Sequence, residues 1–87
     1  MRAAVLREYG EPLEITDVER PSAADHGVVV DVETCGICRS DWHGWQGDYQ
    51  GMDLIGQVMG HEPAGTVIEV GEEVEEFREG DEGVVPF

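Results

Sequence analysis

The segment GVVVDVET, residues 27–34, has the pattern of a β-strand and sets the expected fold class. Its residues alternate with period two, as in a half-buried strand: one face carries Val28, Val30 and Val32, and the other carries Val29, Asp31 and Glu33. The segment GTVIEVG, residues 65–71, shows the same alternation. Turn residues bound three shorter strand candidates, at residues 2–7, 13–18 and 83–85. Several short strands at this spacing predict a small mainly β domain, either a barrel or a sandwich.

The periodic pattern fails between Cys38 and Met59, where glycines interrupt every window. Ser40 or Asp41 is predicted to cap one or two helical turns that run through Trp45. The remainder is predicted to be one long loop, and long loops inside compact domains are commonly functional. The sequence therefore predicts one short helix and one long loop between the strands.

Length and charge limit the possible functions. The chain has 87 residues, enough for one small domain with a marginal core. It contains 20 Asp and Glu residues but only 5 Arg and no Lys, which gives a net charge of −15. Nucleic acid and anionic membranes are excluded as partners, because both require clustered cations.

Acidic residues are concentrated between Glu69 and Glu82, where Arg78 is the only cation. A solvated acidic face on an ordinary cytosolic protein would account for this run. We favour adaptation to a high-salt cytoplasm, because the chain has no lysine and near 1 M salt screens charge repulsion beyond about 3 Å. The halophilic interpretation predicts a protein that needs salt for stability.

The sequence indicates a soluble, cytoplasmic chain. Residues 3–6 form the longest apolar run near the N-terminus, which is too short for a signal peptide. No later run approaches the ~20 apolar residues of a membrane span. The two cysteines, Cys35 and Cys38, are too few for the disulfide framework of a secreted fold, so we expect reduced thiols.

Cys38 and His61, in the segments GICRSDWHGW (residues 36–45) and GHEPAG (residues 60–65), are candidate zinc ligands. A catalytic zinc ion takes three protein ligands and keeps one position open, and the residue pattern supports only these two convincingly. Glu62 is a further candidate, either as a ligand or close behind the metal, although a surface acid would also account for it.

Other polar residues of these segments fit roles around a zinc ion. Asp41 is a candidate to accept a hydrogen bond from the second ring nitrogen of His61 and to fix its tautomer. A zinc ion lowers the pKa of a bound alcohol, so the released proton needs a route out of the site. Ser40, with a hydroxyl group, and His43, with an imidazole ring that can accept and release a proton, are predicted to form that relay.

Cys35 and His26 are predicted to have structural roles. A zinc knuckle would need a second cysteine pair, and a thioredoxin-like site would need a βαβ pattern; the 87 residues contain neither. We therefore interpret Cys35 as a small buried residue. His26 is expected to lie in a turn.

These motifs resemble the N-terminal part of the zinc-dependent medium-chain alcohol dehydrogenase family. The family signature is Gly-His-Glu, two residues, Gly, five residues, Gly, two residues and a small apolar residue. It is matched by residues 60–62, Gly65, Gly71 and Val74. The segment GICRSDWH is similar as well, and the resemblance extends over residues 1–87.

The resemblance implies a fold and a set of roles. The fold would be a GroES-like, partly open β-barrel, incomplete relative to the catalytic domain of the family. Cys38 and His61 would bind the catalytic zinc with Glu62 as the neighbouring acid, Asp41 would orient His61, and Ser40 with His43 would be the relay. Arg39 matches a position that contacts the cofactor pyrophosphate. Trp45 and Tyr49 match positions that line the substrate pocket in some members, which favours small alcohols.

The resemblance also implies what lies outside these residues. The third zinc ligand of the family, a second cysteine, lies beyond the matched segment, and no Gly-x-Gly-x-x-Gly motif occurs in the 87 residues. We expect residues 1–87 to be the N-terminal part of a catalytic domain without a Rossmann cofactor domain. The full-length parent would oxidise alcohols to aldehydes or ketones with Zn²⁺ and NAD or NADP, and the 87 residues alone would be inactive.

An alternative from a different functional class is a stand-alone GroES-like barrel that binds zinc or a partner without catalysis. Zinc-free relatives, such as the quinone-reductase branch or the co-chaperonin, lack the Cys38 and His61 pair. An unfinished barrel edge would also leave strand and apolar surface open, which predicts self-association.

Overall fold

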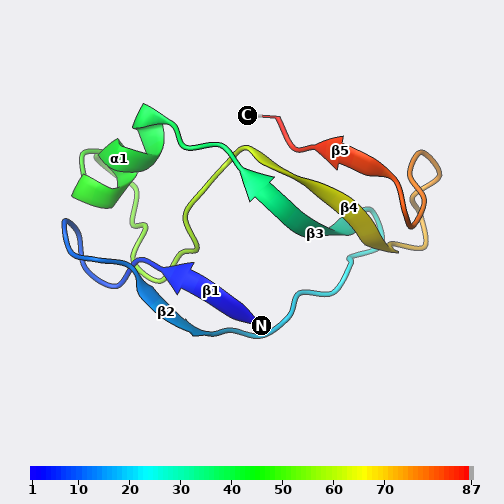
Figure 1. The fold of residues 1–87 in the computed structure, drawn as a ribbon, viewed down its shortest axis with the longest axis horizontal. Coiled ribbons are helices and arrows are strands. Elements are labelled where there is room, and N and C mark those ends of the chain that lie inside the picture. The colour runs from blue at the N-terminus through cyan, green and yellow to red at the C-terminus, as the bar shows by residue number, and fades with distance from the viewer. Residues whose placement is uncertain (87) are drawn as a thin grey trace. The chain divides into compact units, whose positions relative to one another are not determined.

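The computed structural model describes residues 1–86, and Phe87, the last residue of the predicted domain, lies outside the described residues. The chain divides into two compact units, each built from two separate segments. Residues 1–19 and 37–60 form the first unit, and residues 20–36 and 61–86 belong to the second. The elements along the chain are β1 (Arg2–Val5), β2 (Glu14–Asp17), β3 (Val28–Cys35), α1 (Arg39–Gln46), β4 (Pro63–Val70) and β5 (Glu82–Val84) (Figure 1).

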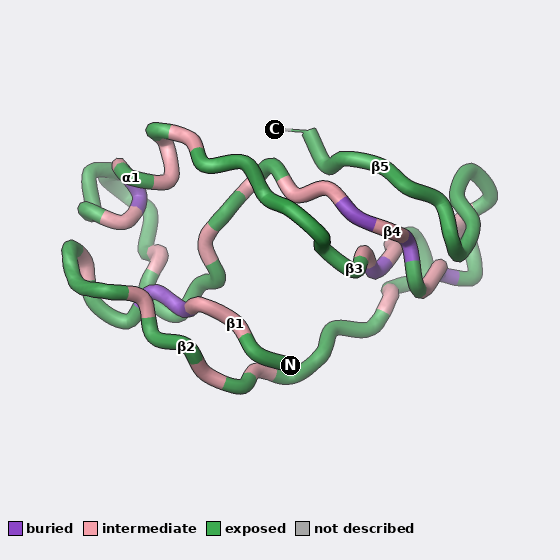
Figure 2. Tube along the Cα trace, viewed as in Figure 1, coloured by how far each residue is buried: buried purple, intermediate pink, exposed green. Residues whose placement is uncertain are grey.

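The first unit is organised around the end of β1. Strands β1 and β2 pair antiparallel, with Val5 opposite Glu14. Val5 and Leu6 are buried (Figure 2). The Leu6 N–H donates to the Gln57 carbonyl at 2.9 Å, and the Leu6 carbonyl accepts from the Gly56 N–H at 2.6 Å. The segment after α1, predicted to be a long loop, is therefore tied back to β1 by backbone hydrogen bonds.

Helix α1 begins earlier than the sequence predicts. Cys38 is its N-cap residue, in an extended conformation, whereas Ser40 or Asp41 was the predicted cap. The Asp41 carboxylate instead reaches back from the first turn and accepts the Cys38 N–H at 3.1 Å. An acid at the third helical position satisfies an otherwise unpaired N–H in this way, so Asp41 stabilises the helix start from inside.

The second unit is a three-stranded antiparallel sheet in the order β3-β4-β5. Its buried side chains are Val29 and Val67, although the expected alternation favours burial of the face that carries Val28 and Val30. Register shifts also interrupt the pairing of β3 with β4. One shift lies between Val29 and Val30, and the other lies between Val32 and Thr34. At the first shift the extra residue is Ile68 of β4, and at the second it is Glu33 of β3. Val32 precedes the second shift and is exposed, like the other residues in the C-terminal half of β3.

The interpretation of Cys35 as a buried residue is wrong. Cys35 is exposed at the end of β3, an outer strand of its sheet, and the last five residues of that strand are all exposed. Its Sγ lies 3.7 Å from the Gly36 carbonyl oxygen. His26 lies in a turn, as expected.

Gly65 and Gly71, two glycines of the signature, are positions of close backbone approach. A Cβ at Gly65 would lie 2.0 Å from the Asp31 carbonyl oxygen of β3. A Cβ at Gly71 would lie 2.0 Å from the Ala24 carbonyl oxygen. Both residues are buried, so any side chain there would push neighbouring backbone apart.

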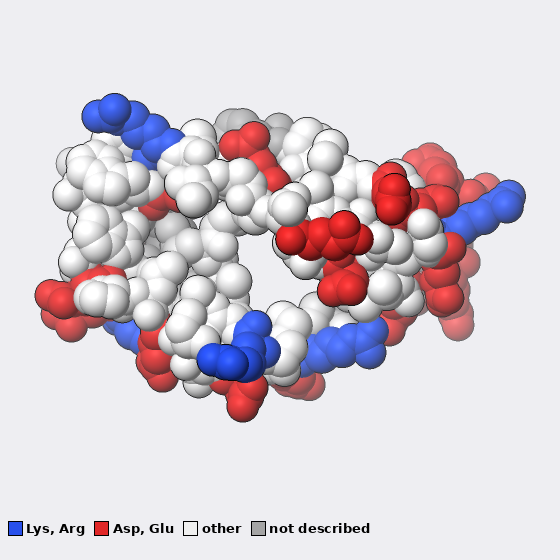
Figure 3. Space-filling model, viewed as in Figure 1, with Lys and Arg blue, Asp and Glu red and all other residues white. Residues whose placement is uncertain are grey.

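The predicted fold class is confirmed. The described residues form two sheets and one short helix, and the strands do not join into one closed barrel within residues 1–86. No helix among these residues has the length and apolar character of a membrane span. Acidic side chains are prominent on the face of the second unit that is visible in Figure 3.

Candidate metal centre

Cys38 belongs to the first unit, where it lies half-buried at the N-terminus of α1. The Ser40 Oγ donates to the Cys38 Sγ at 3.3 Å. A helix N-terminus favours negative charge, and the thiolate is the form of cysteine that binds metals. The local structure thus holds a sulfur ligand beside a hydroxyl group that can exchange a proton.

His61 and Glu62 belong to the second unit and directly precede β4. The His61 Nε2 lies 3.3 Å from the Glu62 Oε1. The His61 side chain is 25% exposed and the Glu62 side chain is 49% exposed, so an ion from solvent can reach both. The Glu62 carbonyl accepts the Gly36 N–H at 3.2 Å, which connects this segment to the residue after β3.

The donor set fits a zinc ion. Thiolate, imidazole and carboxylate are the three types of zinc ligand in proteins. Two ligand atoms about 2.1 Å from a tetrahedral zinc ion are separated by about 3.4 Å, and the His61 Nε2 and Glu62 Oε1 lie 3.3 Å apart. Cys38 and His61 belong to different units, so their sharing of one ion stays a prediction, as does the contact of Asp41 with His61.

The relay residues Ser40 and His43 lie three positions apart on α1, and residues at this spacing share a helix face. The His43 Nδ1 lies 2.8 Å from the Asp48 Oδ2. Sequence reasoning missed Asp48. The signal that could have found it is Gly47, because a glycine that ends a helix in the left-handed region turns the next residue back toward the last turn.

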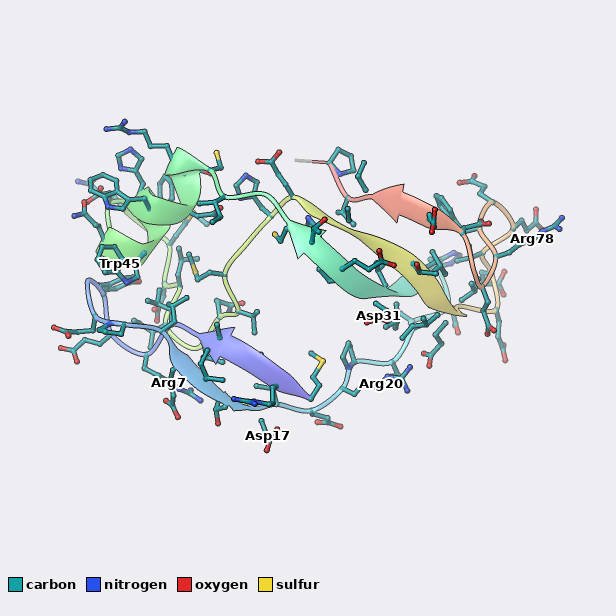
Figure 4. All side chains as sticks on the ribbon, viewed as in Figure 1. Arg7, Asp17, Arg20, Asp31, Trp45 and Arg78 are labelled. Atoms are coloured by element: carbon teal, nitrogen blue, oxygen red, sulfur yellow. The ribbon has the colours of Figure 1, made fainter. Side chains whose placement is uncertain are left out.

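Arg39, Trp45 and Tyr49 are held by contacts within the first unit. The Arg39 guanidinium lies over the Trp42 ring, 5.8 Å from its centroid. The Trp45 Nε1 donates to the Glu11 carbonyl at 2.7 Å, beside the turn that follows β1 (Figure 4). The Tyr49 hydroxyl donates to the Ser40 carbonyl at 3.2 Å. The predicted cofactor contact of Arg39 and the pocket roles of Trp45 and Tyr49 stay predictions.

Comparison with known proteins identifies one family. Residues 24–87 match the family model described as the alcohol dehydrogenase GroES-like domain. An alcohol dehydrogenase from Geobacillus stearothermophilus is 38% identical over 87 residues, which cover 100% of this chain and 26% of that protein.

Solved structures agree with the sequence comparison. An alcohol dehydrogenase superfamily protein from Novosphingobium aromaticivorans has a TM-score of 0.90 and 33% identity, and the match covers 97% of this chain and 26% of that one. A putative zinc-binding dehydrogenase from Sinorhizobium meliloti, bound to NADP, has a TM-score of 0.79 and 30% identity over 93% of this chain and 23% of its own. This chain therefore spans about a quarter of the length of these relatives.

Proposed function

The chain belongs to the zinc-dependent medium-chain alcohol dehydrogenase family, and we propose that it supplies Cys38 and His61 as two ligands of a catalytic zinc ion. The reaction is the reversible transfer of hydride between the carbon of a small alcohol and NAD or NADP. Zinc supplies a Lewis acid that lowers the pKa of the alcohol. The observation that carries the proposal is the 3.3 Å hydrogen bond from the Ser40 Oγ to the Cys38 Sγ, because it puts a proton carrier beside a metal ligand.

Chain connectivity supports a shared site for the two ligands. The Gly36 N–H is bonded to the Glu62 carbonyl inside the second unit. Cys38 follows Gly36 by two residues, so its Cα lies within about 7 Å of the Gly36 Cα in any conformation. The covalent chain therefore keeps the backbone of Cys38 near the segment that carries His61.

Each remaining residue has a role in this proposal. Ser40 accepts the proton of the alcohol hydroxyl group and passes it toward His43, which releases it to solvent. Glu62 is the acid next to the ligand His61, and Asp41 orients that histidine. Three residues complete the proposed site: Arg39 at the cofactor pyrophosphate, and Trp45 and Tyr49 at a pocket for a small alcohol or aldehyde.

A chimera tests the proposal. Residues 1–87 replace the matching N-terminal quarter of the Geobacillus alcohol dehydrogenase, and oxidation of a small primary alcohol is followed with NAD and with NADP. We expect turnover in the chimera and in its Cys35→Ser variant. We expect a loss of about a thousandfold or more in Cys38→Ser, since several kcal/mol of zinc-dependent stabilisation disappear. Equal activity of the two cysteine variants would contradict the proposal, and a folded chimera that binds zinc without turnover would favour a non-catalytic zinc-binding module.

We also propose that the acidic surface is an adaptation to high salt, supported by the eight acids between Glu69 and Glu82. Raising KCl from 0.05 M to roughly 2 M should raise the melting temperature of the chain by about 4–8 °C, equivalent to about 1 kcal/mol, because salt screens the repulsion. Circular dichroism measures the transition. A variant with Glu72, Glu73, Glu75 and Glu76 replaced by glutamine is the control and should show a smaller salt effect. Identical salt dependence of the two proteins would refute this adaptation.

A further inference from the structure

His43 and Asp48, at the C-terminal end of α1, are joined by two hydrogen bonds. The His43 Nδ1 lies 2.8 Å from the Asp48 Oδ2, and the Asp48 backbone N–H donates to the His43 carbonyl at 3.0 Å. The two side chains are 39% and 46% exposed. A surface ion pair of this exposure contributes little to stability, so its significance lies in the orientation that it gives the imidazole ring.

The end of the helix fixes the position of Asp48. Gly47 has φ of +82°, and its N–H donates to the Gly44 carbonyl at 3.1 Å. Together with the bond from Asp48 to His43, this is the Schellman arrangement, which turns the chain back over the last helical turn. A Cβ at Gly47 would lie 2.9 Å from the Cγ of Tyr9, so packing within the first unit also requires glycine here. Backbone geometry therefore brings the Asp48 carboxylate to His43 at little extra cost in side-chain entropy.

Two aromatic rings lie near the His43 imidazole. The Trp42 ring lies edge-on, with centroids 5.0 Å apart and an interplanar angle of 70°. The Tyr49 ring lies at 6.4 Å, and its hydroxyl donates to the carbonyl of Ser40. The titratable groups that face His43 in these contacts are Asp48, from the turn after α1, and Tyr49. An ionised carboxylate can only accept hydrogen bonds, so the Asp48 carboxylate accepts the hydrogen bond from the His43 Nδ1–H.

The geometry points to Asp48 as a positioning residue that holds the proton of neutral His43 on Nδ1 and leaves Nε2 as the nitrogen that accepts the relayed proton. A neutral imidazole has one donor and one acceptor nitrogen, and a carboxylate partner selects which nitrogen carries the hydrogen. When Nε2 takes up a proton, the carboxylate also stabilises the resulting imidazolium ion. This inference rests on the proposed function, in which His43 ends the path from Ser40.

Imidazole ¹⁵N NMR of the 87-residue chain tests the tautomer directly. We expect neutral His43 to carry its proton on Nδ1 in the wild-type chain and to lose that preference in Asp48→Asn, whose amide can donate to Nδ1 instead of accepting from it. Asp17→Asn, which removes an exposed acid from β2 of the same unit, should leave the tautomer unchanged. A proton on Nε2 in the wild-type chain, or an unchanged tautomer in Asp48→Asn, would overturn the inference. The wild-type spectrum is informative even if a variant fails to fold.

The chimera tests the catalytic consequence. Asp48→Asn should lower kcat by about tenfold to a hundredfold with a smaller change in KM, the usual scale for a residue that orients another functional group. The loss should persist over the whole pH range in which His43 is neutral, because the tautomer of the neutral ring causes it. A kcat within about twofold of the parent would overturn the positioning role. The NMR measurement needs neither zinc nor turnover, so an inactive parent chimera with the expected tautomer would count against the proposed function alone.

Discussion

We expect the Cys38→Ser substitution to abolish specific zinc binding by this chain and the Cys35→Ser substitution to leave it intact. We expect the apparent affinity to fall by more than about a hundredfold, because removing a ligand exceeds the 10–100-fold cost of losing a group that only orients one. Cobalt titration provides the measurement, since a thiolate bound to cobalt gives a charge-transfer absorption that a carboxylate or imidazole does not. Molar KCl in the buffer suppresses loose binding to the acidic surface.

The two cysteine variants form a matched pair, because each removes one thiol from the same four-residue segment. Cys35 lies exposed at the end of β3, and Cys38 accepts the Ser40 hydroxyl at the start of α1. A charge-transfer band that survives in Cys38→Ser and disappears in Cys35→Ser would show that Cys35 is the metal ligand and would contradict the proposal. A band that disappears in both variants would indicate a Cys35–Cys38 chelate and would also refute the proposed ligand set.

Substituting Gly65 by alanine should unfold the sheet of the second unit. The added Cβ would lie 2.0 Å from the Asp31 carbonyl oxygen and 3.0 Å from the Val32 Cα, and backbone atoms of a paired strand cannot move aside independently. We expect a loss of about 3–5 kcal/mol in the free energy of unfolding, which consumes most of the stability of so small a domain. Amide hydrogen exchange on β3 and β4 measures it, and protection there should disappear.

Gly83→Ala is the control for this substitution. Gly83 lies directly opposite Gly65 in the β4–β5 pairing, and no heavy atom lies within 4 Å of a Cβ built there. Alanine at position 83 should change the free energy of unfolding by less than about 0.5 kcal/mol, as for an ordinary surface substitution. Similar hydrogen exchange in the two variants would show that the close approach at Gly65 is not a real constraint.

The strands were predictable wherever β-branched residues alternate with polar ones. The β3 and β4 regions follow from the period-two pattern of Val28, Val30 and Val32 and from that of Thr66, Ile68 and Val70. The register shifts between β3 and β4 were not predictable, because a bulge depends on both paired strands and the extra residues, Ile68 and Glu33, carry no local pattern that marks one.

The residues of the candidate site were predictable as chemical types but not as contacts. Cys38 and His61 are suggested by their ligand atoms alone, and Ser40 by its hydroxyl group. The role of Asp48 was not predicted, because its contact with His43 depends on the left-handed backbone conformation of Gly47. Cys35 was wrongly placed inside because its burial was inferred from the average behaviour of cysteine and not from its position on an outer strand.

The signature itself combines two kinds of constraint. His61 and Glu62 carry atoms that can bind a metal, and their side chains lie 3.3 Å apart. Gly65 and Gly71 carry no chemistry, and the backbone of the second unit requires them because neighbouring carbonyl groups occupy the space of a Cβ. The match to the signature therefore reflects a closely packed strand as well as a pair of candidate metal ligands.

Each unit is assembled from two segments of the chain that the other unit interrupts, and this has a consequence for biosynthesis. As the polypeptide leaves the ribosome, β3 emerges long before β4, and Val28 cannot pair until its partner Val70 has been synthesised. The first unit is likewise incomplete until Gln57 arrives to bond with Leu6. Such long-range pairing loses the conformational entropy of a long loop before the new contacts stabilise the fold. We therefore expect slow folding, during which the unpaired β-strands are exposed. Nascent chains of this protein should therefore depend on chaperones more than a helical domain of equal length does.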